Sequence, residues 1–127
     1  APVVDTLYYE HRVERKGLNL MIGPGNDNVS ITNLLASGAQ ELLFTTGRGN
    51  PLATAIPTIK LASNAVMANR KHNWIDFNAG TLVEDEEPHA VLERLIDKIL
   101  TTANGEHLKH ERTGFKEIAI FKSGVTL

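Results

Sequence analysis

The stretch "ELLFTTGRGNP", residues 41–51, begins as an apolar segment and breaks into a polar turn that contains one arginine. The residues from Gln40 to Thr46 predict a β-strand. The turn after it holds two glycines, which allow positive φ angles and close approach of the backbone to a ligand. A simple chain reversal does not require two threonines, an arginine and an asparagine as well. The stretch therefore predicts a strand that ends in a ligand-binding turn.

Strand and turn units of the same kind recur along the chain. The stretch "GLNLMIGPGND" predicts a strand at Leu18–Ile22, buried on both faces, and then a turn. The stretch "VSITNLLASG" predicts a short helix, with Asp27 or Asn28 as N-cap and Gly38 just beyond its end. The remaining short elements are strands at Thr58–Ser63 and Trp74–Asn78, a short helix or helical turn over residues 64–72, and a last strand or extended tail at Glu117–Phe121.

The clearest helical pattern lies between Pro88 and Ala103. Pro88 suits the first helical position, and Gly105 suits the end of a helix. The acidic run Glu84–Glu87 precedes the helix, where its dipole favours negative charge, and is predicted to be a solvated helix start rather than a metal site. Apolar residues recur at three- and four-residue spacing and predict one apolar stripe, made of Val91, Leu92, Leu95, Ile96, Ile99, Leu100 and Ala103.

The alternation of strands with helices predicts an α/β fold with a mainly parallel sheet and flanking helices. The length of 127 residues predicts a single domain over residues 1–127. In open α/β sheets, ligands bind beyond the carboxyl ends of the strands. We therefore expect "GPGND", "TTGRGN" and the end of "WIDFN" with Ala79 and Gly80 to lie at one sheet edge.

Composition excludes several classes of function. The formal net charge of −2 provides no positive field for nucleic acid or for an anionic membrane. The absence of cysteine excludes disulfides, thiolate nucleophiles and Cys-ligated metals within the chain. No apolar run of membrane-spanning length and no signal-like start occur. These features predict a cytoplasmic protein, and the first residue, Ala1 rather than Met, is compatible with a processed or excised piece.

The "TTGRGN" turn is the main candidate site. The Arg48 guanidinium can pair both oxygens of a carboxylate or phosphate. The groups around it suit a small, anionic, polyhydroxylated ligand, and we favour this function over a tight turn with an exposed arginine. The predicted substrate-binding residues are Thr45, Thr46, Gly47, Arg48, Gly49, Asn50 and Asn64.

Other candidates carry weaker signals. The turn of Gly23, Gly25, Asn26 and Asp27 opens a helix, so it is either a plain turn or a secondary anion site. It lacks the third glycine of a dinucleotide fingerprint and the Lys-Ser/Thr end of a P-loop. Lys60 lies inside an apolar strand. A lysine in such a position is exposed at a sheet edge, paired with another group, or functional, and the sequence leaves these three alternatives open. The last candidates are Asp76, for which a structural hydrogen bond is favoured over a metal ligand, Asn78, and the pair His107 and His110, which is expected to be solvated.

Several of these motifs together resemble a known family. The stretches "GLNLMIGPGND", "LLFTTGRGNP", "PTIKLASN", "WIDFNAG" and "IAIFKSGVTL" are similar, in order, to the carboxyl-terminal part of the sugar-acid dehydratases, the altronate and galactarate dehydratase family. The resemblance covers nearly all of the chain from Gly17 onward, and "FTTGRG" with "IDFNAG" is its most specific part. It implies a Rossmann-like domain that forms the last portion of a much longer enzyme.

The family resemblance also implies an activity. Its members eliminate water from a sugar acid with a divalent metal, expected to be Fe²⁺, that polarises the substrate while a base removes the proton α to the carboxylate. Arg48 would then hold the substrate carboxylate, and Lys60 is the candidate base. The metal ligands are expected mainly outside this chain. The implied partners are a sugar acid and the remaining domains of the enzyme, with homo-oligomer formation left open, and the isolated piece is expected to be inactive.

Two alternatives remain from the sequence. One is a sulfolactate sulfo-lyase subunit, which looks similar in this region and eliminates sulfite rather than water. The other is a non-catalytic module that binds an anion or a nucleotide, supported only by the two glycine-rich turns.

Overall fold

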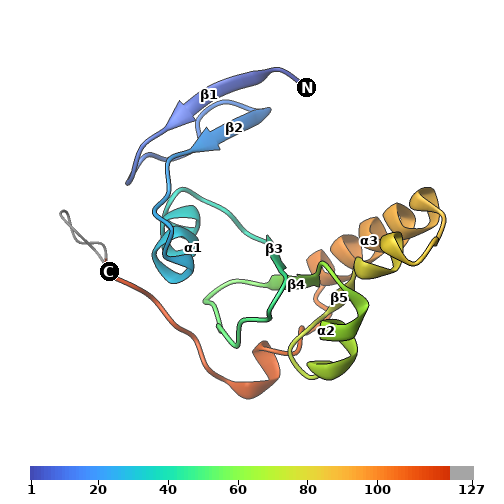
Figure 1. Cartoon of the computed structure of the whole chain (residues 1–127). Coiled ribbons are helices and arrows are strands. Elements are labelled where there is room, and N and C mark those ends of the chain that lie inside the picture. The colour runs from blue at the N-terminus through green and yellow to red at the C-terminus, as the bar shows by residue number, and fades with distance from the viewer. Residues whose placement is uncertain (121–127) are drawn as a thin grey trace. The chain divides into compact units, whose positions relative to one another are not determined.

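The computed structural model describes residues 1–120, in which parallel strands form two small sheets flanked by helices (Figure 1). The chain divides into two compact units. Among the described residues, one contains residues 1–40 and 117–120, and the other contains Glu41–Lys116. Every strand pairing within residues 1–120 is parallel. The predicted α/β class with a mainly parallel arrangement is therefore confirmed, as is its consistency with a Rossmann-like fold.

The first unit contains a strand that the sequence did not reveal. This strand, β1 (Val3–Leu7), pairs in parallel with β2 (Leu18–Met21) in a two-stranded sheet. The strand predicted at Leu18–Ile22 corresponds to β2. The prediction that it is buried on both faces is wrong, because Leu18 and Leu20 are 46% and 51% exposed. The side chains that point away from the covered face of this narrow sheet remain at the surface.

The helix after this sheet, α1 (Asp27–Ala36), begins one or two residues earlier than predicted. Its N-cap is Asn26, not Asp27 or Asn28. The Asn26 backbone is extended, and its side-chain oxygen accepts hydrogen bonds from the N–H groups of Asn28 and Val29 at 3.1 and 3.2 Å. Gly38 has a φ of +106° just beyond the C-cap, as predicted, since glycine adopts this conformation without strain.

The second unit contains a three-stranded sheet in the order β3 (Leu42–Thr46), β4 (Thr58–Ala62) and β5 (Phe77–Asn78). The first two strands match their predicted positions within two residues. The third is shorter than the predicted Trp74–Asn78. The N–H groups of Trp74 and Ile75 both donate to the carbonyl of Lys71, so the turn after the preceding helix takes these residues out of the sheet.

Strand β4 lies at the centre of this unit and packs on both faces. Ile59 and Leu61 belong to an apolar cluster against the helix α3 (Pro88–Ala103). Ala62 belongs to a second cluster with Met67 and Ala68 of the helix α2 (Ala65–Arg70). Two short 3₁₀ helices, η1 (Gly80–Val83) and η2 (Glu111–Thr113), complete the unit.

The helix α3 has the predicted bounds, with Pro88 in its first turn and Gly105 just beyond its C-cap. Its apolar stripe is divided, however. Val91, Leu95 and Ile99 face the core, whereas Leu92, Ile96 and Leu100 are 52%, 47% and 55% exposed. The predicted apolar stripe is therefore buried along one side only. Among residues 1–120, no helix is long and apolar enough to cross a membrane.

This division predicts unequal effects of truncation. Leu95→Ala removes contacts with the core and should cost about 2 kcal/mol of unfolding free energy in this chain. Ile96→Ala removes a side chain that is half exposed and should cost less than about 1 kcal/mol. Urea unfolding of both variants measures the difference. Equal losses would show that the two halves of the stripe are buried alike.

The last predicted element lies partly outside the described residues. Residues 117–120 have an isolated β-bridge at Glu117 but no strand, and Ala119 donates its N–H to the Thr32 hydroxyl of α1 at 3.0 Å. Of the two alternatives, the structure thus has an extended tail at 117–120. Phe121 and the remaining residues of the predicted closing motif are not described.

Candidate functional site

The turn formed by Thr45–Asn50 leaves the carboxyl end of β3 and is closed by its own side chains. The Thr46 hydroxyl accepts the N–H of Gly49 at 2.9 Å, and the Asn50 side-chain oxygen accepts the N–H of Leu52 at 3.0 Å. Gly49 has a φ of +83°, which an L side chain would adopt only with strain. The Arg48 side chain is exposed at the tip of this closed turn.

Asn64 joins this turn to the helix α2. Its side-chain oxygen accepts the N–H of Met67 at 2.8 Å and so caps the helix. Its side-chain amide donates to the carbonyl of Gly47 at 3.0 Å. Asn64 thus lies where the sequence predicted, beside the turn, and both ends of its amide have a protein partner there.

The end of β5 reaches the same edge of the sheet. The Asn78 side-chain oxygen accepts the N–H of Gly80 at 2.9 Å. A Cβ atom added to Gly80 would lie 2.2 Å from the nitrogen of Ala65 and 2.4 Å from the Cα of Asn64. The chain after β5 therefore packs directly on the start of α2. Two of the three segments expected at this edge, the Arg48 turn and the chain around Gly80, are brought together, and Asn64 contacts both.

Lys71 is a residue at this edge that the sequence analysis missed. Its ammonium donates a hydrogen bond to the carbonyl oxygen of Arg48 at 2.6 Å. The same ammonium lies 5.0 Å from the centre of the Trp74 ring, within the range of a cation–π interaction. The three-residue spacing from Lys71 to Trp74 is a weak signal for such a pair, and nothing local links Lys71 to the turn.

Lys60 lies in the interior rather than at a sheet edge. It occupies the middle of the central strand β4 and is 2% exposed, which excludes the edge-exposed alternative. Beside it on the strand is Thr58, whose hydroxyl is 2.8 Å from that of Thr54, and Thr54 in turn is 3.3 Å from His110 Nε2. A role for Lys60 as general base stays a prediction, and it requires a path from the substrate to this buried cluster.

The prediction that His107 and His110 are both solvated holds for His107 only. His110 is 5% exposed, because the segment after α3 folds back against β4. Burial lowers the pKa of His110, and the charge of Lys60 lowers it further, while the charges of Glu111 and Asp76 act in the opposite direction. His110 is therefore held in its neutral form near neutral pH.

This shift predicts a pH-dependent stability. In the unfolded chain, histidine takes up a proton near its ordinary pKa of 6.5, whereas folded His110 does so only at lower pH. As the pH falls through 6.5, the unfolded state gains the proton first, so the free energy of unfolding decreases, by at most about 1.4 kcal/mol per pH unit. Urea unfolding between about pH 7.5 and pH 5.5 should show a smaller decrease in His110→Gln than in the unmodified chain. His107→Gln is the matched control, and a decrease in His110→Gln as large as in this control would contradict the assignment.

Asp76 has the structural role that the sequence favoured. One carboxylate oxygen accepts the N–H of Lys60 at 3.0 Å, and the other accepts the N–H of Lys109 at 3.1 Å. Asp76 thus joins β4 to the segment that follows α3. Both of its oxygens are used in holding the chain together.

The "GPGND" turn belongs to the other sheet, so the prediction that it shares a sheet edge with the Arg48 turn is wrong. It follows β2, whose parallel partner is β1, a strand hidden from the sequence pattern. The Asn26 side chain occupies the first N–H groups of α1, and the Ser30 hydroxyl donates to the carbonyl of Pro24 at 2.7 Å. The turn is therefore closed by its own polar groups, and a secondary anion site at Gly23, Gly25, Asn26 and Asp27 stays a prediction.

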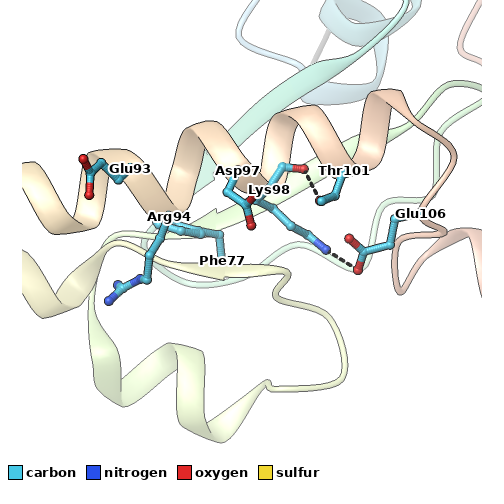
Figure 2. Close-up of a pocket in the computed structure, with 7 residues that line it drawn as sticks. All are labelled: Phe77, Glu93, Arg94, Asp97, Lys98, Thr101 and Glu106. Atoms are coloured by element: carbon cyan, nitrogen blue, oxygen red, sulfur yellow. Dashed lines mark hydrogen bonds and ion pairs between the residues drawn. The ribbon is translucent and has the colours of Figure 1, made fainter.

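An open groove runs along α3 (Figure 2). Both of its basic residues are paired within the chain: Lys98 pairs with Glu106 at 2.8 Å, and Arg94 pairs with Glu86. The hydrogen bond from Lys98 lowers the pKa of Glu106 and so keeps this carboxylate charged. The groove has the character of a solvated helix face, and none of the predicted site residues lines it.

The described residues do not fit the divalent-metal site that the family resemblance implies. Within residues 1–120, no group of three or more His, Asp or Glu side chains is placed to hold a metal ion. The candidate site of this chain is therefore the cationic turn around Arg48.

Comparisons with known proteins identify the same family that the sequence motifs resemble. The family described as "D-galactarate/Altronate dehydratase, C-terminal" matches residues 1–126. Altronate dehydratase of Bacillus subtilis (strain 168) is 48% identical over 128 residues, which cover 100% of this chain and 26% of that protein. Galactarate dehydratase (L-threo-forming) of Escherichia coli (strain K12) is 38% identical over 82% of this chain and 20% of that protein. The (2R)-sulfolactate sulfo-lyase subunit beta of Chromohalobacter salexigens is 32% identical over 71% of this chain and 24% of that protein.

The chain thus spans about a quarter of the length of the curated relatives that it matches. The family match extends over nearly the whole sequence, including both glycine-rich turns and the end of β5. This chain belongs to the family of carboxyl-terminal domains of D-galactarate/altronate dehydratases.

Proposed function

We propose that this chain is the carboxyl-terminal part of a hydro-lyase that removes water from a sugar acid, altronate or galactarate. The observation that carries the proposal is the exposed Arg48, presented on a closed turn at the carboxyl edge of a parallel sheet. Parallel α/β sheets bind ligands at this edge. The names of the relatives support a hydroxylated carboxylate as the ligand.

The chemistry assigned to the turn is recognition of the carboxylate next to the reacting carbon. Arg48 pairs with the two carboxylate oxygens, and the Thr45 and Thr46 hydroxyls with Asn50 contact the neighbouring oxygens. Hydrogen bonds to a charged group are worth about 1.5–3 kcal/mol each. When a base removes the α-proton, negative charge moves onto the carboxylate and the β-hydroxyl leaves as water. A guanidinium at this carboxylate stabilises that developing charge.

The remaining parts of the reaction are proposed to lie in other regions of the complete protein. We expect a divalent metal, Fe²⁺ being the favoured ion, to be bound by residues beyond the part of the chain described here. The base is Lys60 or a residue of another domain. The separate chain is accordingly expected to bind sugar acids weakly and to lack dehydratase activity.

Elimination of sulfite from sulfolactate is the second candidate function. It is favoured only by the more distant relative, which is 32% identical to this chain, against 48% for the altronate dehydratase. A purely anion-binding module has no support among the relatives, whose names are those of lyases and dehydratases.

The proposal is tested by assaying the complete protein that carries this chain. Altronate, galactarate and (2R)-sulfolactate are supplied separately, with Fe²⁺ and a reductant, and the keto acid or the sulfite formed is measured. Dehydration of altronate or galactarate is the expected result. Sulfite release with no dehydration would establish the second candidate, and no reaction with any of the three would contradict a lyase.

A further inference from the structure

Lys71 is built into the turn that carries Arg48. Its ammonium is 2.6 Å from the Arg48 carbonyl, although the two residues lie 23 positions apart in the sequence. A Cβ atom on Gly49 would lie 2.7 Å from Lys71 Cδ, so the glycine leaves the space through which this side chain passes. The Trp74 ring, three residues further along the chain, also lies against the ammonium. The position of the charge is therefore fixed by three separate contacts.

The two cations at this turn have no acidic partner among residues 1–120. The ion pairs in that part of the chain involve neither Arg48 nor Lys71. Arg48 and Lys71 therefore bring two positive charges to the same turn, and a positively charged surface favours the binding of an anion. An ammonium has three N–H donors, and the Arg48 carbonyl is the one hydrogen-bond acceptor recorded for Lys71 within residues 1–120.

We infer that Lys71 is a second ligand-binding cation of this site, and that its remaining donors bind a carboxylate oxygen of the ligand held by Arg48. The inference rests on the proposed function and extends it, because it assigns a sugar-acid contact to a residue outside the "TTGRGN" motif. Lys71 also orients Arg48, since its hydrogen bond to the Arg48 carbonyl fixes the backbone from which the guanidinium projects.

A purely structural role for Lys71 makes a different prediction. If Lys71 only closed the turn, its loss would lower stability, and the affinity for charged and neutral ligands would change alike. A ligand-binding cation has a charge-dependent effect instead. Lys71→Met removes the ammonium and keeps an apolar stem against Trp74. It removes both the charge and the hydrogen bond to the Arg48 carbonyl, so the salt dependence of binding is needed to identify the contribution of the charge.

The experiment is calorimetric titration of the complete protein with altronate and with galactarate. In Lys71→Met we expect Kd for both sugar acids to rise about tenfold, with little change in the melting temperature. Lys71→Arg should recover part of the affinity. Added salt should weaken binding more in the unmodified protein than in Lys71→Met, because salt screens the Lys71 charge, which the variant lacks. Lys98→Met is the matched control, since Lys98 pairs with Glu106 on α3 and should leave Kd unchanged.

The outcomes separate this inference from the function on which it rests. If the unmodified protein dehydrates a sugar acid but Lys71→Met and Lys98→Met have the same Kd, only the assignment of Lys71 is overturned. A lower melting temperature in Lys71→Met, with unchanged Kd, overturns it as well and leaves Lys71 as a structural residue. If the unmodified protein neither binds nor converts any sugar acid, both the function and the inference fail.

Discussion

A Gly80→Ala variant is expected to lose about 3 kcal/mol of unfolding free energy, one of the two largest effects predicted for this chain. The added Cβ would lie 2.2 Å from the nitrogen of Ala65 and 2.3 Å from the carbonyl carbon of Asn64. These are backbone atoms at the start of α2, so no side-chain rotation can relieve the overlap. The helix must move away from the end of β5, and the apolar cluster beneath it, which includes Met67 and Ala68, must open.

The same displacement should disturb the candidate site. Asn64 caps α2 and donates to the carbonyl of Gly47, so a shift of the helix start pulls on the turn that carries Arg48. We therefore expect sugar-acid binding to weaken together with stability.

Gly25→Ala is the matched control for this variant. A Cβ atom on Gly25 would meet nothing within 4 Å, and its φ lies outside the left-handed region. Its unfolding free energy should change by less than about 0.5 kcal/mol. Urea unfolding of the two variants side by side gives the comparison. Equal stability of Gly80→Ala and Gly25→Ala would mean that the close contact at Gly80 is absent in solution.

The elements that sequence predicted well have local signals. The helix α3 has a proline at its start, a glycine just beyond its end and apolar residues at helical spacing. Strands β3 and β4 are short apolar runs bounded by turn residues. Strand β1 was missed because Asp5 and Thr6 interrupt its apolar pattern and because its partner, β2, comes after a long connection.

Burial was less predictable than secondary structure. The apolar stripe of α3 gives no indication that Ile96 is exposed while Leu95 faces the core, because the width of the sheet beneath the helix decides this. Lys60 and His110 are polar residues that the chain buries together, and they approach each other only through the fold.

The candidate site shows the same distinction. Thr46 and Asn50 close the turn through neighbours two or three residues away, so the local sequence could suggest their roles. The bonds from Asn64 to Gly47 and from Lys71 to Arg48 span 17 and 23 residues. The family motif indicated Asn64, whereas Lys71 could be found only from its position in the structure.

The second large effect is expected at Arg48. In the complete protein, Arg48→Lys keeps the positive charge but loses the planar pair of donors that matches a carboxylate. We expect kcat/KM for altronate and galactarate to fall about ten- to a hundredfold, equivalent to about 1.4–2.7 kcal/mol. The unfolding free energy should hardly change, because the side chain is exposed and the turn is closed by other groups.

Steady-state kinetics distinguish two roles of the guanidinium in this loss. If Arg48 binds the carboxylate equally in the ground state and the transition state, KM rises and kcat is preserved. If it also stabilises the charge that grows on the carboxylate as the α-proton leaves, kcat falls too, and we expect both changes. Arg48→Ala should be the more severe variant, since it removes the charge as well as the geometry. Arg94→Lys is a suitable control, because Arg94 pairs with Glu86 on the solvated face of α3. Unchanged kcat/KM in both Arg48 variants, each folded, would leave Arg48 as a surface residue of the turn and remove the support for a carboxylate site there.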